Sequence, residues 1–201
     1  MLLHIHPEDP QPRNIRTAVE ILQDGGIIVY PTDTIYGLGC DIYNTKAVER
    51  ICRIKQIDPR KAQLSIICSD LSHLSTFAKQ IPTATYRVLR EHLPGPYTFI
   101  LPASKQVPKI LKTKKDTIGL RVPDNKISIT LIKELGNPIL STSLPGENVE
   151  DYTDPEIIYE KYEKLVDLVI DGGIGGTVPS TIINCVGDTF ELIRQGAGEW
   201  Q

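Results

Sequence analysis

The densest cluster of chemically capable side chains in the sequence is the nonapeptide PTDTIYGLG at residues 31–39. It supplies hydroxyls at Thr32 and Thr34, a carboxylate at Asp33, and two glycines that let a polar ligand approach the backbone closely. The nonapeptide directly follows the apolar run IIVY, which predicts a buried strand, and ligands of α/β proteins bind beyond the carboxyl ends of strands. The same residues could instead form a turn in which Thr and Asp bond their own backbone, so the string alone leaves both interpretations open.

A guanidinium stands near the end of a second apolar run, TIGLRVP at residues 117–123. The planar fork of Arg121 binds a carboxylate or a phosphate in bidentate fashion, so this position favours an anionic ligand. The alternative is an internal ion pair with one of the 25 acidic residues, and the sequence does not decide between the two.

Hydroxyl and guanidinium groups recur at the predicted ends of other strands. Ser141, Thr142 and Ser143 follow the strand residues Ile139 and Leu140. The strings Pro179-Ser180-Thr181 and Arg194-Gln195-Gly196 repeat the theme. Because hydroxyls are costly to bury without partners, these side chains either cap local structure or line one shared cleft. A glycine-rich string at 172–176 could wrap a phosphate, but such a string is more often a turn.

The elements that must position these residues follow from hydrophobic periodicity. Helical spacing of apolar residues predicts helices at 13–26, 45–55, 71–78, 82–93, 127–136 and 154–166. Short apolar runs predict strands at 27–30, 64–69, 97–102, 117–123, 138–143, 167–173, 180–186 and 190–196, the last two separated by Gly187 and Asp188. Helices interleaved with strands indicate an α/β fold with a twisted mixed sheet and covering helices, in a single domain over residues 1–201.

Composition excludes several functional classes. A net charge of −3 argues against a surface that is basic throughout, so any nucleic-acid contact must be local. The four cysteines are scattered, no secretory leader precedes them and no apolar run could span a bilayer, which predicts a cytoplasmic protein without a membrane partner. No His/Cys spacing indicates a metal site, and neither G-x-x-x-x-G-K-[ST] nor G-x-G-x-x-G occurs.

In their order along the chain, PTDTIYGLG, a helix end with a lysine, TIGLRVP, PILSTS, PSTI and R-x-G-x-G resemble the motifs of the YrdC/YciO family over nearly the whole chain. The segments HPEDPQPRNI and RICRIKQIDPRKAQLSIICSDLSHLS resemble its YciO branch. The resemblance implies a YrdC-like fold, a twisted sheet with a large concave cavity. For the synthases of this family it implies that L-threonine, bicarbonate and ATP react to give threonylcarbamoyl-AMP and pyrophosphate, which serves threonylcarbamoyladenosine formation in tRNA.

The resemblance also implies a role for each matching position. Thr34 and Arg121 are expected to face the threonine, with Thr32 supporting their loop. Three positions are expected to contact the nucleotide: Thr117, Ser143 and Arg194. Three others are expected at the junction of the two substrates: Ser141, Ser180 and Thr181. Lys55 is expected to contact phosphates and to form the catalytic pair with Arg121. ATP is expected to arrive with Mg²⁺ as a substrate, without a tightly bound cofactor.

Three departures from the family pattern fall on the side that handles ATP. The arginine of the synthase K-x-R string, which begins at Lys55, is replaced by Ile57. The asparagine of S-x-N is replaced by Pro145, and the synthase histidine by Ile67. Arg60 and Lys61 are candidate substitutes for the missing cation. These losses predict a cleft that keeps its threonine-binding side but has weak or no synthase activity.

A different functional class remains open beside the enzyme. Five lysines lie within residues 105–115, enough to attract phosphates locally, although such a run more often forms a solvated loop. The rival interpretation is a ribosome-associated or RNA-binding factor that holds tRNA or double-stranded RNA through its phosphates and shape.

Overall fold

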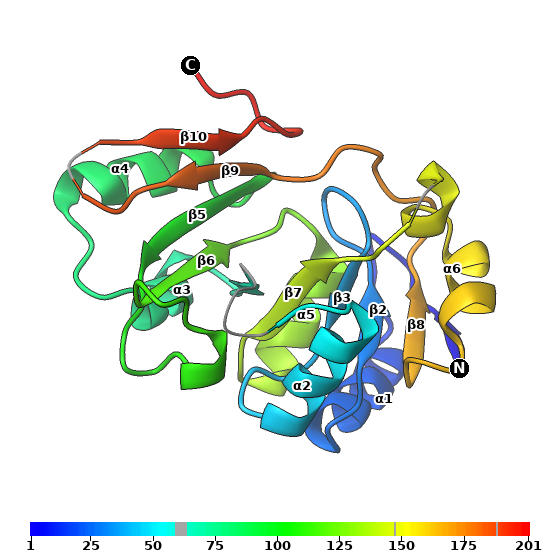
Figure 1. Ribbon diagram of the computed structural model, residues 1–201. Coiled ribbons are helices and arrows are strands. Elements are labelled where there is room, and N and C mark those ends of the chain that lie inside the picture. Colours follow the sequence, from blue (N-terminus) through cyan, green and yellow to red (C-terminus); the bar gives the residue numbers. More distant parts are fainter. Residues whose placement is uncertain (59–63, 147, 188) are drawn as a thin grey trace.

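The computed structural model describes residues 1–58, 64–146, 148–187 and 189–201. Its strands form one mixed ten-stranded sheet in the order β1-β8-β2-β3-β7-β4-β6-β5-β9-β10, with helices packed on it (Figure 1). The strands are β1 Leu2–His4, β2 Ile28–Tyr30, β3 Gly37–Gly39, β4 Ser65–Ile67, β5 Tyr97–Pro102, β6 Thr117–Arg121, β7 Ile139–Ser143, β8 Leu168–Asp171, β9 Thr181–Asn184 and β10 Glu191–Arg194. The predicted α/β class with a twisted mixed sheet is therefore confirmed.

The helices begin and end where the sequence provides caps. Their bounds are α1 Pro12–Gln23, α2 Thr45–Ile54, α3 Leu71–Phe77, α4 Thr83–His92, α5 Lys126–Leu135 and α6 Pro155–Tyr162, with short 3₁₀ turns η1 Lys109–Leu111 and η2 Val149–Tyr152. Asp70 caps α3 by accepting the backbone N–H of His73. Pro82 is the N-cap of α4, one position earlier than the expected first turn. Gly136 ends α5 at φ 77°, a left-handed conformation that glycine adopts without strain.

Two hydrophobic cores lie on opposite faces of the sheet. One core packs α1 and α5 against β2, β8 and the ends of β4 and β7, with Leu22, Leu131 and Ile139 fully or almost fully buried. The larger core joins α2, α3, α4 and α6 to the other face. Because strands alternate their side chains between faces, a strand with an apolar core side can present polar groups on its opposite side.

The sheet twists strongly along its length. In Figure 1, strands β5, β9 and β10 run across the direction of β2, β3 and β8. Strands β4, β6 and β7 connect these two regions, β4 pairing parallel with β6 and antiparallel with β7. This twist brings together segments from both ends of the chain over the middle of the sheet.

Some elements differ from those expected. The nonapeptide 31–39, for which no strand was predicted, contains strand β3, which pairs antiparallel with β2 and β7. Tertiary pairing thus makes a strand of a glycine-rich string with little strand propensity. Strand β7 runs from Ile139 to Ser143, so the three hydroxyl residues belong to the strand, within the predicted range 138–143. The last two predicted strands correspond to β9 and β10, which pair antiparallel, and Asp188 between them lies outside the described residues. None of the described helices combines the length and the apolar character needed to cross a membrane.

Candidate functional site

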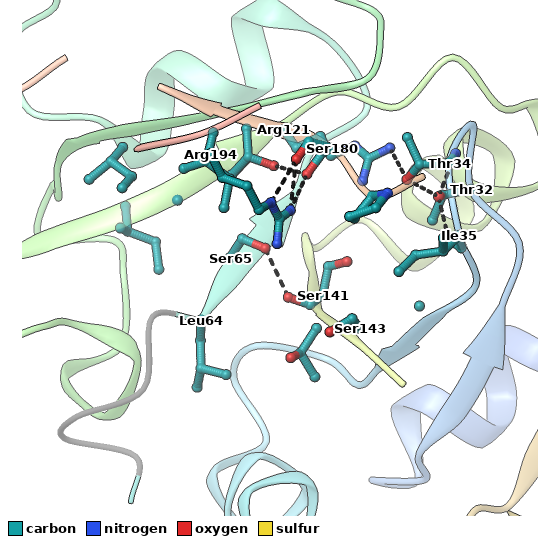
Figure 2. Close-up of a pocket in the computed structure, with 18 of the residues that line it drawn as sticks. Thr32, Thr34, Ile35, Leu64, Ser65, Arg121, Ser141, Ser143, Ser180 and Arg194 are labelled. Carbon is teal, nitrogen blue, oxygen red and sulfur yellow. Dashed lines mark hydrogen bonds between the residues drawn. The ribbon is translucent and has the colours of Figure 1, made fainter. Parts of the chain in front are cut away.

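A cavity of about 150 Å³ lies over the middle strands of the sheet, between the loop after β2 and the strands β5, β9 and β10. Eight of the ten residues predicted for the site line it, and Figure 2 shows most of them around the opening: Thr32, Thr34, Thr117, Arg121, Ser141, Ser143, Ser180 and Arg194. The cavity therefore lies above the face of the sheet, and not only beyond the carboxyl ends of its strands as expected.

Strand β6 shows how the sequence builds the floor of the cavity. Thr117, Gly119 and Arg121 all line the cavity, at alternate positions of the strand, while Leu120 between them is fully buried in the core. A Cβ added to Gly119 would lie 3.0 Å from Cβ of Ser65 and 3.2 Å from Cγ2 of Thr98. A larger side chain at 119 would therefore crowd its neighbours and reduce the space for a ligand.

Arg121 is held by the loop that follows β2. Its Nη2 donates to Oγ1 of Thr34 at 2.8 Å and forms an ion pair with Oδ1 of Asp33. The Arg121 and Asp33 side chains are only 8% and 10% exposed. The internal ion pair that the sequence left open is thus present, yet Arg121 also lines the cavity. Thr32 supports the loop because its hydroxyl donates to the carbonyl of Ile35 at 2.7 Å and lies 3.1 Å from the Thr34 hydroxyl.

Arg194 approaches the cavity from the opposite wall. Its Nε and Nη2 donate to the carbonyl of Ser180 at 3.2 Å and 2.7 Å, which fixes the plane of the guanidinium (Figure 2). The Ser180 hydroxyl lies 2.9 Å from that of Thr98. Burial lowers the pKa of Arg194, and the nearby positive charge of Arg121 lowers it further. The two guanidinium groups therefore repel one another, and an anionic ligand beside Arg194 would offset this repulsion.

Lys55 lies beside the cavity but not in its lining. It ends α2, and its Nζ donates to the carbonyl of Ser143 at 2.5 Å and lies 3.3 Å from that residue's hydroxyl. Burial lowers the pKa of Lys55. The ammonium is thus directed at Ser143, and through this residue it adjoins the cavity.

Thr181 was expected at the junction of the two substrates, but it does not line the cavity. Its hydroxyl donates to the carbonyl of Gly198 at 2.5 Å and accepts the backbone N–H of Gly196 at 2.9 Å. The position faces the opposite side of the sheet from the neighbouring lining residue Ile182, because side chains alternate along β9. Thr181 therefore anchors the C-terminal segment.

Three hydroxyl residues of the lining were not predicted, namely Ser65, Thr98 and Thr113. Ser65 donates to the carbonyl of Ser141 at 2.9 Å, and the hydroxyls of Thr113 and Thr117 lie 2.7 Å apart. Each hydroxyl stands alone among apolar residues or lysines in the sequence. Only the pairing of β4, β5 and β6 brings these residues to the cavity.

The positions that depart from the family pattern lie outside the lining. Ile67 is fully buried in the core that packs α1 and α5 against the sheet, and Ile57 packs against the larger core. Pro145 is exposed, and its carbonyl accepts from the hydroxyl of Tyr162. Arg60 and Lys61 lie outside the described residues. No group of three or more His, Cys, Asp or Glu side chains in the described part of the chain is arranged to hold a metal ion.

Three residues with unpartnered polar atoms include Arg121 of the cavity lining and its ion-pair partner Asp33. In the described ranges, the buried side-chain nitrogen and oxygen atoms without a hydrogen-bond partner are Tyr30 Oη, Asp33 Oδ2 and Arg121 Nε. Tyr30 precedes the loop that holds Asp33, and Asp33 is paired with Arg121. Because buried polar groups are nearly always paired, these atoms favour a ligand or ordered water that supplies the missing partners.

Comparison with known proteins agrees with this architecture. The Sua5/YciO/YrdC family model, described as "Telomere recombination", matches residues 20–196. YciO of Escherichia coli is 47% identical over 98% of this chain and 95% of its own length, and its crystal structure superposes with a TM-score of 0.92 over 99% of this chain and 97% of that one.

Relatives with a named activity or ligand are more distant. A threonylcarbamoyl-AMP synthase of Coxiella burnetii is 32% identical over 92% of this chain and 99% of its own. The crystal structure of Pyrococcus abyssi Sua5 complexed with L-threonine, 28% identical, has a TM-score of 0.87 over 98% of this chain and 57% of that one. The sequence match over most of the chain and the shared fold together show that this protein belongs to the Sua5/YciO/YrdC family.

Proposed function

We propose that the cavity binds L-threonine together with an adenine nucleotide, and that the protein is a threonylcarbamoyl-AMP synthase-like enzyme with weakened synthase activity. The observation that carries the proposal is the buried Nε of Arg121, which has no partner in a cavity lined by hydroxyl groups. A relative of the same fold, the Sua5 of Pyrococcus abyssi, is described in complex with L-threonine. A threonine carboxylate is an acceptor that suits such a guanidinium.

The Arg121 side of the cavity suits the amino acid. Asp33 and Thr34 together hold Nη2, so the guanidinium is oriented before a ligand arrives. A carboxylate can then accept from the remaining N–H groups without displacing Asp33. The small lining residues Gly37, Gly119 and Ser141 leave room for a side chain of threonine size.

The Arg194 side suits the nucleotide. Arg194, Ser143 and Thr117 belong to this region, and Lys55 adjoins it through Ser143. Cations that stabilise developing charge on phosphates are the main requirement of phosphoryl and nucleotidyl transfer. Ile57 stands where the synthases have a second cation, so we infer that MgATP, taken as a substrate, is held less firmly and that turnover with bicarbonate and threonine is low.

Calorimetric titration with L-threonine tests the binding half of this proposal. We expect binding of L-threonine, weaker binding of D-threonine, and at least about tenfold weaker binding after Arg121→Lys, since lysine keeps the charge but loses the fork, a change of about 1.4 kcal/mol. Pyrophosphate release with L-threonine, bicarbonate and MgATP tests the second half. No detectable threonine binding would remove the proposal, and turnover at rates typical of enzymes would refute the weakened activity.

A second candidate function rests on the lysines that flank the cavity. Lys105, Lys109, Lys114 and Lys115 are exposed, on the segments before and after the lining residue Thr113. This local positive charge suits tRNA or double-stranded RNA at the cavity mouth. Filter binding over a salt series separates the candidates: tight RNA binding with a steep salt slope, and no thermal shift from ATP or threonine, favours the RNA-binding factor.

A further inference from the structure

Tyr30 is fixed beneath the cavity by two glycines of the neighbouring strand. It is the last residue of β2, directly opposite Gly37 of β3, and it is fully buried. A Cβ added to Gly37 would lie 3.0 Å from Cζ of the Tyr30 ring, and one added to Gly39 would lie 2.7 Å from its Cε1. The ring thus occupies the space that side chains at these positions would need, and its hydroxyl has one available location.

That hydroxyl has no hydrogen-bond partner among the described residues, although it is buried. A phenylalanine would fill the same space without an unsatisfied polar atom, so packing alone does not explain a tyrosine here. Burial raises the pKa of Tyr30, and the phenol therefore keeps its proton and remains a hydrogen-bond donor.

The Tyr30 ring extends toward the cavity lining, because it lies against Gly37 and Gly39 of β3, and β3 pairs on its other edge with β7, where Ser143 lies opposite Gly37. Ser141 lies on β7, two positions before Ser143, and it opposes in part the effect of burial on the pKa of Tyr30, although the Tyr30 hydroxyl forms no hydrogen bond with the described part of the chain. Ser141 lines the cavity and is 8% exposed, so its hydroxyl can meet both Tyr30 and a ligand. Its backbone carbonyl accepts from Ser65, which holds the strand in place.

We propose that Tyr30 is a positioning residue of the ligand site: its O–H donates to Oγ of Ser141 when a ligand is bound, and the Ser141 O–H then points into the cavity and donates to a ligand oxygen. A hydroxyl whose acceptor site is occupied in this way selects ligand groups that accept, such as a carboxylate, carbamate or phosphate oxygen, over groups that donate. The proposal rests on the proposed function for the identity of the ligand, because L-threonine is the probe that carries such an oxygen.

The test is a double-mutant cycle with Tyr30→Phe, Ser141→Ala and both together, read by the Kd for L-threonine and by Tm. We expect Y30F to have a Tm equal to or above that of the wild type, because it removes an unsatisfied buried hydroxyl. The Kd should rise about three- to tenfold, the value of one hydrogen bond. The double variant should bind no more weakly than S141A, since Tyr30 acts through Ser141.

Tyr162→Phe is the matched control. The Tyr162 ring is 4% exposed, its hydroxyl donates to the carbonyl of Pro145 at 2.5 Å, and the residue does not line the cavity. Removing this satisfied hydroxyl should lower Tm and leave the Kd for L-threonine unchanged. Tyr30 should thus show the opposite pattern from a tyrosine whose role is structural.

Two results would overturn the inference: a fall in Tm for Y30F like that of Y162F with an unchanged Kd, or additive effects of Y30F and S141A on the Kd. A wild-type protein that does not bind L-threonine overturns the proposed function, and the cycle is then repeated with AMP, whose phosphate oxygens are also acceptors. Weaker AMP binding by Y30F supports the role of Tyr30. Unchanged or undetectable AMP binding removes that role as well.

Discussion

The buried ion pair of Arg121 and Asp33 allows a quantitative test of how the site is held together. Substitution of Arg121 by methionine keeps most of the apolar stem but leaves the Asp33 carboxylate, which is 10% exposed, without its counter-ion. Breaking a buried pair from one side costs about 3–5 kcal/mol of unfolding free energy. Asp33→Asn should cost a similar amount, because it leaves the Arg121 charge buried.

The double variant R121M/D33N distinguishes this reasoning from simple loss of packing. It removes the pair without leaving a buried charge, so we expect it to be at least about 2 kcal/mol more stable than the sum of the single effects predicts. Urea unfolding measures all four proteins. With an m-value of about 2 kcal/mol/M, a loss of about 3–5 kcal/mol lowers the urea midpoint by about 1.5–2.5 M.

Two probes make the assay rigorous. Trp200 is the single tryptophan, and the centroid of its ring lies 5.1 Å from that of His92 and 6.4 Å from that of Phe99. Its fluorescence therefore reports the unfolding of the β5 region, while circular dichroism reports that of the whole chain. The exposed pair of Lys126 and Glu8 supplies the control, since K126M should leave the midpoint unchanged. Additive single effects, or an R121M midpoint within error of the wild type, would refute the claim that Arg121 and Asp33 depend on one another.

Three further predictions follow from neighbouring contacts. Gly176→Ala should weaken threonine binding and cost about 1–3 kcal/mol of stability, because its Cβ would lie 2.6 Å from the carbonyl oxygen of Thr34. Gly136→Ala is the control: its Cβ would have no atom within 4 Å, and its Kd for threonine, measured by calorimetry, should not change. Thr181→Val should lower Tm through the loss of two hydrogen bonds, about 1–3 kcal/mol, without changing the Kd for threonine or AMP. The lowered pKa of Lys55 predicts that AMP affinity falls with rising pH in a range below the pKa of an ordinary lysine, and that K55M abolishes this dependence. In that pH range the unfolded chain binds more protons than the folded chain, so the free energy of unfolding should rise with pH.

The sequence predicted the convergence of the site better than its local contacts. Thr34, Arg121, Ser143 and Arg194 were expected to share one cleft, because hydroxyl and guanidinium groups at several strand ends are costly unless they meet. All four line the cavity. The sequence did not predict whether Arg121 would pair with an acidic side chain or remain unpaired for a ligand. That choice depends on where the loop after β2 directs Asp33, and strand periodicity carries no information about the direction of a loop.

The errors have a common physical origin in strand pairing. Thr181 was grouped with Ser180 because they are adjacent in sequence, yet adjacent residues of a strand face opposite sides. Thr98 was not predicted because its partner, the Ser180 hydroxyl, lies 82 positions away and the register of β5 with β9 alone brings them together. Strand β3 was missed because two of its three residues are glycines, whose place in the sheet is set by the Tyr30 ring and not by propensity.

The two sides of the cavity differ in how their charge is balanced, and this difference bears on the order of ligand affinity. Arg121 is compensated by Asp33, whereas the described partner of Arg194 is Ser180, a neutral residue, and that of Lys55 is the neutral Ser143. The uncompensated charge therefore lies on the side of the cavity for which we propose nucleotide binding, even though Ile57 stands there in place of a cation of the synthase pattern. An amino-acid carboxylate at Arg121 gains from orientation and hydrogen bonding more than from net charge, so its affinity should depend little on salt. A phosphate at Arg194 should lose affinity steadily as salt rises, because its binding depends on the charges that the protein leaves unpaired.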